Sequence, residues 1–164
     1  MRPPVAPHPD LSPLEFLIGR WVGAGVGGYP TIESFHFEQE LVIQHDGRPL
    51  LIHAARSWLL DSETGERVRP SAAESGFWRP AAAGEVELLL AHGSGFLEIW
   101  IGRVSGLTVQ LVTDVVARTA SAKEVTGGRR AYGLVEEELL VSYDMAAVGE
   151  ELQPHLSVRM RRAD

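Results

Sequence analysis

The chain has 164 residues, which suits a single domain, and its net charge is −7. A phosphate backbone would repel so acidic a chain unless a local basic patch were present. The absence of cysteine excludes disulfides, thiolate catalysis, Cys-ligated zinc, iron–sulfur clusters and covalently attached c-type haem. No apolar run reaches the roughly 20 residues that span a bilayer, and no signal peptide is recognisable. We therefore expect a cytoplasmic protein with neither nucleic-acid nor membrane partners.

The N-terminal region predicts a tail followed by one helix. Repeated prolines make residues 1–10 a flexible tail, so residues 11–164 form the single folded domain. Ser12 followed by Pro13 is typical of a helix start, and Glu15 completes a capping box. The apolar face of this short helix consists of Leu14, Leu17 and Ile18.

The rest of the chain predicts short strands separated by turns. In residues 35–43 apolar and polar side chains alternate, as in a half-buried strand, and Asp46–Gly47 marks a hairpin. Further strand candidates are residues 49–58, 76–79, 86–92, 96–104, 107–116, 120–126, 130–135, 138–144 and 155–162. About ten short strands joined in sequence predict an all-β fold, a lipocalin-like antiparallel up-and-down β-barrel with one short N-terminal helix. Such a barrel has room for one small ligand.

Spaced glycines mark residues 19–25, which read Gly-Arg-Trp-Val-Gly-Ala-Gly. A nucleotide-binding loop is excluded because a helix precedes these glycines, whereas a dinucleotide fingerprint follows a strand and opens a helix. The structural interpretation is a first barrel strand in which Trp21 fills the closed end and the glycines permit tight curvature. In the following Tyr-Pro-Thr-Ile, the hydroxyls of Tyr29 and Thr31 have either a structural or a ligand-lining role.

Together, Gly-x-Trp-x-Gly-x-Gly and Tyr-Pro-Thr-Ile resemble the nitrobindin family of small haem-binding barrels, which are shaped like fatty-acid-binding proteins. The motif residues are Gly19, Trp21, Gly23 and Gly25. The similarity continues through residues 74–79 (Glu-Ser-Gly-Phe-Trp-Arg), 143–147 (Tyr-Asp-Met-Ala-Ala) and 154–156 (Pro-His-Leu). It therefore covers nearly the whole chain from residue 11 onward.

The resemblance implies a ten-stranded barrel that holds ferric haem b without a covalent bond, with His155 as the axial iron ligand. It also implies that Thr31 lies on the open side of the haem and that Arg129 or Arg130 lies near it, where a guanidinium would suit a propionate. Family members bind nitric oxide and convert peroxynitrite to nitrate, so the chain is expected to be a haem-dependent peroxynitrite isomerase with these small molecules as partners. A homodimer is left open. Where many relatives carry a histidine, this chain has Ala72-Ala73.

The pattern around His155 leaves its direction open. Leu156, Val158 and Met160 share one face of the last strand, and His155 lies on the other. If the apolar face is the packed interior, His155 points outward, whereas a polar-lined interior would turn it inward. The family motif favours the inward direction.

Other sites and functions are weaker alternatives. His45 and His53 flank a hairpin without a third ligand, so a zinc site is not favoured, and His92 is interpreted as a turn residue. No Gly-x-Ser-x-Gly elbow supports a serine hydrolase. Two alternative functions remain: a non-enzymatic carrier of a fatty acid or other small apolar ligand, and storage or sensing of nitric oxide on the same haem.

Overall fold

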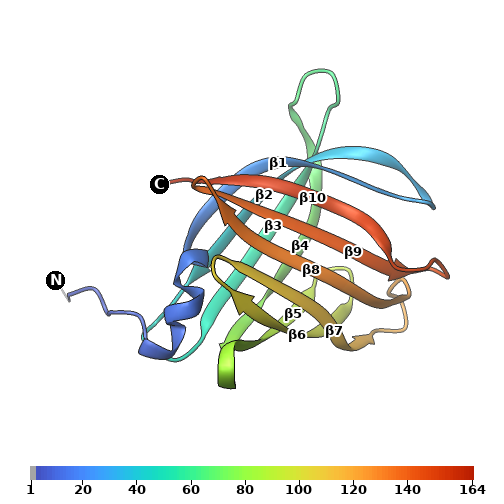
Figure 1. Ribbon diagram of the computed structural model, residues 1–164. Helices are drawn as coiled ribbons and strands as arrows, with labels where there is room; N and C mark the ends of the chain where they lie inside the picture. Colours follow the sequence, from blue (N-terminus) through green and yellow to red (C-terminus); the bar gives the residue numbers. More distant parts are fainter. Residues whose placement is uncertain (1–2) are drawn as a thin grey trace.

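Ten strands joined by short turns make a closed antiparallel barrel in the computed structural model, which describes residues 3–164 (Figure 1). Each strand pairs with its neighbours in sequence, and β1 closes the ring against β10. The strands are β1 (Gly19–Tyr29), β2 (Ile32–Gln44), β3 (Leu51–Leu60), β4 (Arg67–Pro80), β5 (Glu85–His92), β6 (Phe96–Ser105), β7 (Thr108–Arg118), β8 (Val125–Val135), β9 (Glu138–Ala147) and β10 (Gln153–Arg162), with a one-turn 3-10 helix η2 (Ala82–Gly84). The predicted all-β barrel is confirmed.

The N-terminal helix differs from the prediction in its start and in its type. It is a 3-10 helix, η1 (Pro9–Leu17), capped by His8, whose Nδ1 accepts the backbone N–H of Asp10 at 3.2 Å. The predicted start at Ser12 is therefore wrong, and the proline-rich tail ends earlier than expected. The reason lies in the buried residues, which recur every three positions as a 3-10 helix requires: Leu11, Leu14 and Leu17.

This helix closes one end of the barrel. The indole N–H of Trp21 donates to the Leu17 carbonyl at 2.9 Å, and the Trp21 side chain is fully buried. The guanidinium of Arg162 lies 4.3 Å over the Trp21 ring and donates to the carbonyls of Phe16 and Ile18 at the end of the helix. The last strand thus holds the helix in place, and the opposite end of the barrel is the mouth.

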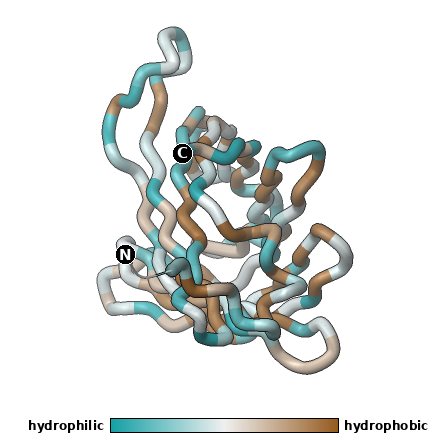
Figure 2. Tube along the Cα trace, turned by 90° about the vertical axis from the view of Figure 1, so that its left-hand side faces the viewer, coloured by the Kyte–Doolittle hydropathy of each residue, from teal (hydrophilic) through white to brown (hydrophobic). Residues whose placement is uncertain are grey.

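The barrel wall is uneven at the mouth. β4 pairs with β3 from Arg67, but it pairs with β5 only from Glu74 onward. The outer halves of β3 and β4 therefore project beyond the rim as a hairpin (Figures 1 and 2). The predicted strand at residues 120–126 is wrong, because residues 119–124 form a loop in which the Ala122 N–H donates to the Thr119 carbonyl, and β8 starts at Val125.

The main core fills the barrel from the closed end. Its largest fully buried side chains are Trp21, Trp78, Trp100 and Tyr132, from four different strands. Hydrophobic and hydrophilic segments alternate along the strands, as expected where one face of each strand packs inside (Figure 2). In the described part of the chain, no helix is long and apolar enough to cross a membrane.

Candidate functional site

His155 points into the barrel because β10 bulges at this residue. Pro154 pairs with Asp144 and Leu156 pairs with Tyr143, so His155 is an extra residue between two ladder pairs. Its ring centroid lies 5.6 Å from that of Tyr143, a ring on the inner face of β9. The bulge lets both His155 and the apolar residues that follow it face the interior, which strict alternation does not allow.

The hydrogen bond of His155 defines which ring nitrogen is free. Its Nδ1 lies 3.0 Å from the carbonyl oxygen of Gly28, in a second bulge on the neighbouring strand β1. Because a carbonyl only accepts, Nδ1 carries the proton and Nε2 keeps its lone pair. Burial lowers the pKa of His155, and although the Gly28 carbonyl opposes this, the charge of Arg130 adds to the lowering. The ring is therefore neutral near pH 7, the form in which imidazole binds a metal.

Aromatic rings fix the position of His155. Tyr29 meets it edge-on at 5.6 Å, and Phe35 lies 6.4 Å away. The Tyr29 hydroxyl accepts the N–H of Ala147 at 3.0 Å and donates to the carbonyl of Met145 at 3.0 Å. Tyr29 therefore connects the end of β1 to the end of β9, on either side of the His155 bulge.

A second apolar cluster, separate from the main core, lies at the mouth. It consists of Tyr29, Val125 and Ala147, with Phe96, Val116 and Met145 packed against them. Gly128 lies beside it and is covered by the rings of Trp100 and Tyr143, since a Cβ there would lie 2.8 Å from both. The apolar surface of the cluster, next to His155, suits a flat apolar ligand.

Beneath the mouth lies a buried ion pair between Arg130 and Glu74. The guanidinium of Arg130 donates to both carboxylate oxygens of Glu74, at 2.9 and 2.8 Å, and to the Tyr132 hydroxyl at 3.1 Å. Burial on its own would raise the pKa of Glu74, but the charge and hydrogen bonds of Arg130 and a hydrogen bond from His53 hold it well below the usual value. Burial raises the pKa of Tyr132 to about 12.

Arg130 also contacts the mouth. Its Cζ lies 4.6 Å from the Tyr143 ring and 5.1 Å from the Trp100 ring. Three buried polar atoms around it have no hydrogen-bond partner: Nε of Arg130, the hydroxyl of Tyr143 and Oε2 of Glu98. The floor of the mouth is therefore polar, although the cluster above it is apolar.

His53 belongs to this buried network and has no free nitrogen. Its Nδ1 accepts the indole N–H of Trp78 at 3.0 Å, and its Nε2 donates to Glu74 at 3.0 Å. Among residues 3–164, no group of three or more His, Cys, Asp or Glu side chains is arranged to hold a metal ion.

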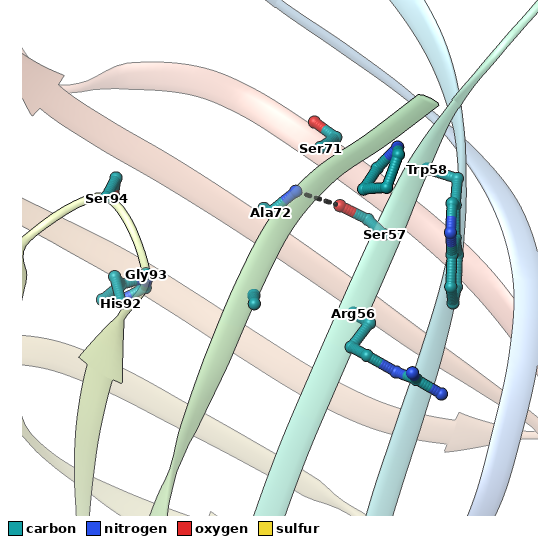
Figure 3. Close-up of a pocket in the computed structure, with 10 residues that line it drawn as sticks. Arg56, Ser57, Trp58, Ser71, Ala72, His92, Gly93 and Ser94 are labelled. Atoms are coloured by element: carbon teal, nitrogen blue, oxygen red, sulfur yellow. Dashed lines mark hydrogen bonds between the residues drawn. The ribbon is translucent and has the colours of Figure 1, made fainter. Parts of the chain in front are cut away.

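His92 is a half-buried, oriented residue that the sequence pattern did not single out. Its ring stacks on Phe96 with centroids 3.9 Å apart, its Nε2 is hydrogen-bonded to Glu98, and its Nδ1 lies 3.6 Å from Glu74. It lines a cavity of about 470 Å³ between β4 and the β5–β6 turn (Figure 3). The available signal was Glu98, a carboxylate on the inward face of a strand between Phe96 and Trp100.

The other predicted residues lie in different places. Thr31 is exposed in the β1–β2 turn, and Arg129 is exposed on the outside of β8, opposite in direction to Arg130. Gly23 and Gly25 let β1 approach β10, since a Cβ at these positions would lie 1.9 and 2.2 Å from carbonyl oxygens of that strand. Gly19 and Trp21 belong to the closed end. Of the predicted residues, His155 and Tyr29 lie at the mouth and Arg130 lies beneath it.

Comparison with known proteins assigns the chain to a family. The model of the THAP4-like, haem-binding β-barrel domain matches residues 10–162. The chain belongs to this family. A crystal structure of Rv2717c from M. tuberculosis has the same fold, with a TM-score of 0.85 and 36% identity, covering 97% of this chain and 100% of that one.

Curated relatives cover nearly the whole chain. A protein of Nocardioides sp. named peroxynitrite isomerase is 54% identical over 94% of this chain and 94% of its own length. A Salinispora tropica protein of the same name is 48% identical over 94% of this chain and 81% of its own. A ferric nitrobindin-like protein of Streptomyces griseus is 42% identical, over 94% and 82% respectively. The resemblance to the nitrobindin family is confirmed.

Proposed function

We propose that the protein is a haem-dependent peroxynitrite isomerase, in which His155 is the axial ligand of a non-covalent ferric haem b. The observation that carries the proposal is the inward-facing His155, whose Nδ1 is bound to Gly28 and whose Nε2 is free. The activity is that of the relatives named peroxynitrite isomerase, which match over almost the whole chain.

The residues at the mouth fit a haem. A neutral imidazole is a standard ligand of haem iron, and because the chain has no cysteine the group would be held by His155 and by packing, without a thioether bond. The apolar cluster at the mouth suits the macrocycle. For the propionates we propose Arg118, which pairs with Phe96 on the inward row of β7 and has a half-exposed guanidinium at the rim.

This changes the proposed roles of the predicted arginines. Arg130 already donates with both Nη atoms to Glu74, so we propose that it forms the floor of the site instead of pairing with a propionate. Arg129 points away from the mouth and has no proposed role. Thr31, exposed in the β1–β2 turn, is a candidate only for the outer edge of the site.

The chemistry divides between cofactor and chain. When bound, a ferric haem would supply the chemistry for converting peroxynitrite to nitrate, an isomerisation with no gain or loss of atoms or charge. The chain holds the cofactor through Nε2 of His155, while Gly28 keeps the proton on Nδ1 and so fixes the tautomer. The rings of Tyr29, Phe35 and Tyr143 limit rotation of the imidazole and exclude water from its faces.

Nitric oxide is a second proposed ligand, because a neutral diatomic molecule fits the same haem site. Storage or sensing of nitric oxide would use this site without catalysis. A carrier of fatty acids would use the barrel without haem. The cytoplasmic location and a homodimer remain predictions.

Stopped-flow kinetics with peroxynitrite test the proposal. The haem-loaded protein should accelerate peroxynitrite decay and raise the yield of nitrate, while the apoprotein and the His155→Ala variant incubated with haem should not. His36→Ala is the matched control, because His36 is exposed on β2, outside the barrel. Equal acceleration by the His155→Ala variant would overturn the assignment. A haem-loaded protein that binds nitric oxide but leaves peroxynitrite decay unchanged would favour the storage function.

A further inference from the structure

The two histidines at the mouth lie on opposite walls of the barrel. His92 ends β5, and His155 lies near the start of β10. In the closed ring, β5 is five strands from β10 in either direction. Because neighbouring strands are antiparallel, the end of β5 and the start of β10 reach the same rim.

The width of the barrel sets the distance between them. Ten strands about 4.8 Å apart and tilted by about 40° form a ring roughly 20 Å across, which leaves about 10 Å between two inward-pointing imidazoles on opposite walls. A chain of contacts crosses the floor between the two histidines. The ring of His155 meets that of Tyr143 at 5.6 Å, Tyr143 meets Arg130 at 4.6 Å, Arg130 lies 4.0 Å from Glu98, and Glu98 is hydrogen-bonded to His92.

The ring of His92 is held in one orientation with one nitrogen unpartnered. Glu98, whose side chain is fully buried, binds Nε2, and Phe96 stacks on the ring face. Nδ1 lies 3.6 Å from Glu74, which is too far for a hydrogen bond. A buried carboxylate on one imidazole nitrogen orients the ring and leaves the other nitrogen to exchange a proton.

Charged side chains from three strands surround His92. The groups that face it are Glu98 on β6, Glu74 on β4 and, behind them, Arg130 on β8. These comprise two carboxylates and one guanidinium. An N–H donor on the imidazole suits an anionic ligand.

His92 also has a route to solvent. It lines the 470 Å³ cavity, whose other walls include residues 71–73 of β4 and the turn residues Gly93 and Ser94 (Figure 3). Beyond the pair of Glu74 with His92, β4 continues without a partner on β5, and the cavity lies in this gap in the wall. Small side chains at this gap leave His92 accessible to small molecules and to protons.

We propose that His92, oriented by Glu98, is the acid–base residue that faces the ligand position across the mouth from His155, and that it donates a hydrogen bond from Nδ1 to an anionic ligand such as peroxynitrite. This inference rests on the proposed haem site, because it needs a ligand held on the His155 side. Neither the family motif nor the alternation of the strands assigns a role to His92.

Azide titrations of the ferric haem-loaded protein test the proposal by visible absorption, independently of catalysis. In His92→Gln the azide affinity should fall about tenfold, since a charge-assisted hydrogen bond is lost. Glu98→Gln should lower it in the same direction but less, because the ring loses its charged partner and keeps its place. The affinity for neutral nitric oxide should stay within about twofold in both variants, and His36→Gln, outside the barrel, should change neither ligand.

The outcomes separate this inference from the function on which it rests. If both variants bind haem and azide as the wild type does, His92 has no role towards the ligand. Equal losses of azide and nitric oxide affinity would indicate a disturbed pocket and would also overturn the proposal. Glu98→Gln retains an acceptor and covers the case in which His92→Gln does not fold. A wild type that binds no haem would overturn the proposed function itself.

Discussion

Glu74→Gln removes the central carboxylate of the buried network. Glu74 accepts three hydrogen bonds, two from Arg130 and one from His53, at 2.8 to 3.0 Å. A glutamine side chain offers one oxygen and places an NH₂ group against donors. It also leaves the charge of Arg130, which is 6% exposed, without its main partner.

The size of the effect follows from this burial. Removing one member of a buried pair costs about 3–5 kcal/mol, because the remaining charge stays in the interior without compensation. For a chain of this length each kcal/mol shifts the melting temperature by about 2–4 °C, so Glu74→Gln should melt about 10 °C below the wild type. The loss is a large fraction of an ordinary free energy of unfolding, which is about 5–15 kcal/mol.

Urea and thermal unfolding of the apoprotein measure this change. The matched control is Glu40→Gln, since Glu40 forms comparable ion pairs with Arg20 and Arg56 at 2.6 and 2.7 Å on the outer surface. Such exposed pairs contribute less than about 1 kcal/mol. The double variant Glu74→Gln/Arg130→Met should be more stable than the sum of the single effects predicts, because no unpaired charge remains. Equal losses of unfolding free energy in Glu74→Gln and Glu40→Gln would refute the reasoning.

The same carboxylate gives a pH dependence. Its folded pKa lies well below 4.5, although burial opposes this, because of the charge and hydrogen bonds of Arg130. The unfolded chain therefore takes up the proton first as the pH falls. The stability that Glu74 contributes is complete above about pH 4.5 and is lost as the pH falls through its folded pKa. The difference in unfolding free energy between the wild type and Glu74→Gln should therefore become smaller as the pH falls below about 4.5.

Three further predictions concern single residues. Tyr29→Phe should lower the free energy of unfolding in urea by about 1–3 kcal/mol, because the Ala147 N–H loses its partner. Tyr143→Phe removes a hydroxyl that has no partner and should change this free energy little. Similar losses of unfolding free energy in both variants would contradict this. Glu137 has a left-handed φ of 68°, which glycine adopts without steric cost, so Glu137→Gly should raise the unfolding free energy by about 1 kcal/mol. An unchanged or lower melting temperature would contradict this prediction. Burial lowers the pKa of His155, so the stability that its neutral ring contributes is complete above about pH 6.5 and is lost as the pH falls through the folded pKa. Between pH 7 and pH 5, the free energy of unfolding in urea should fall more for the apo wild type than for His155→Asn. Equal falls in the two proteins would contradict this prediction.

The barrel could be predicted because its signals are local. Alternating side chains and turn residues recur along the chain, and sequential strands joined by short turns leave few topologies other than a meander. The helix was assigned the wrong start because Ser12 and Pro13 matched a capping pattern, while the three-residue spacing that begins at Leu11 set the 3-10 geometry. The strand predicted at residues 120–126 failed because turn hydrogen bonds of Thr119 and Ala122 decide that segment.

The site depended on contacts between distant strands. His155 could be found only through the family motif, since its inward direction comes from a bulge that the pairing of β10 with β9 creates. Alternation alone leaves the direction open. The Glu74–Arg130 pair joins β4 to β8 across 56 residues, and no local pattern reports such a contact. For His92, the inward carboxylate of Glu98 was a signal that could have been recognised.

The central claim is that Nε2 of His155 holds the haem, and a visible absorption titration with ferric haem tests it most directly. The wild-type apoprotein should develop a Soret band that saturates at one equivalent of haem. His155→Ala, with its fold verified by circular dichroism, should not develop this band. A His155→Ala variant that binds haem with the wild-type spectrum, or a folded wild type that gives no band at all, would contradict the account.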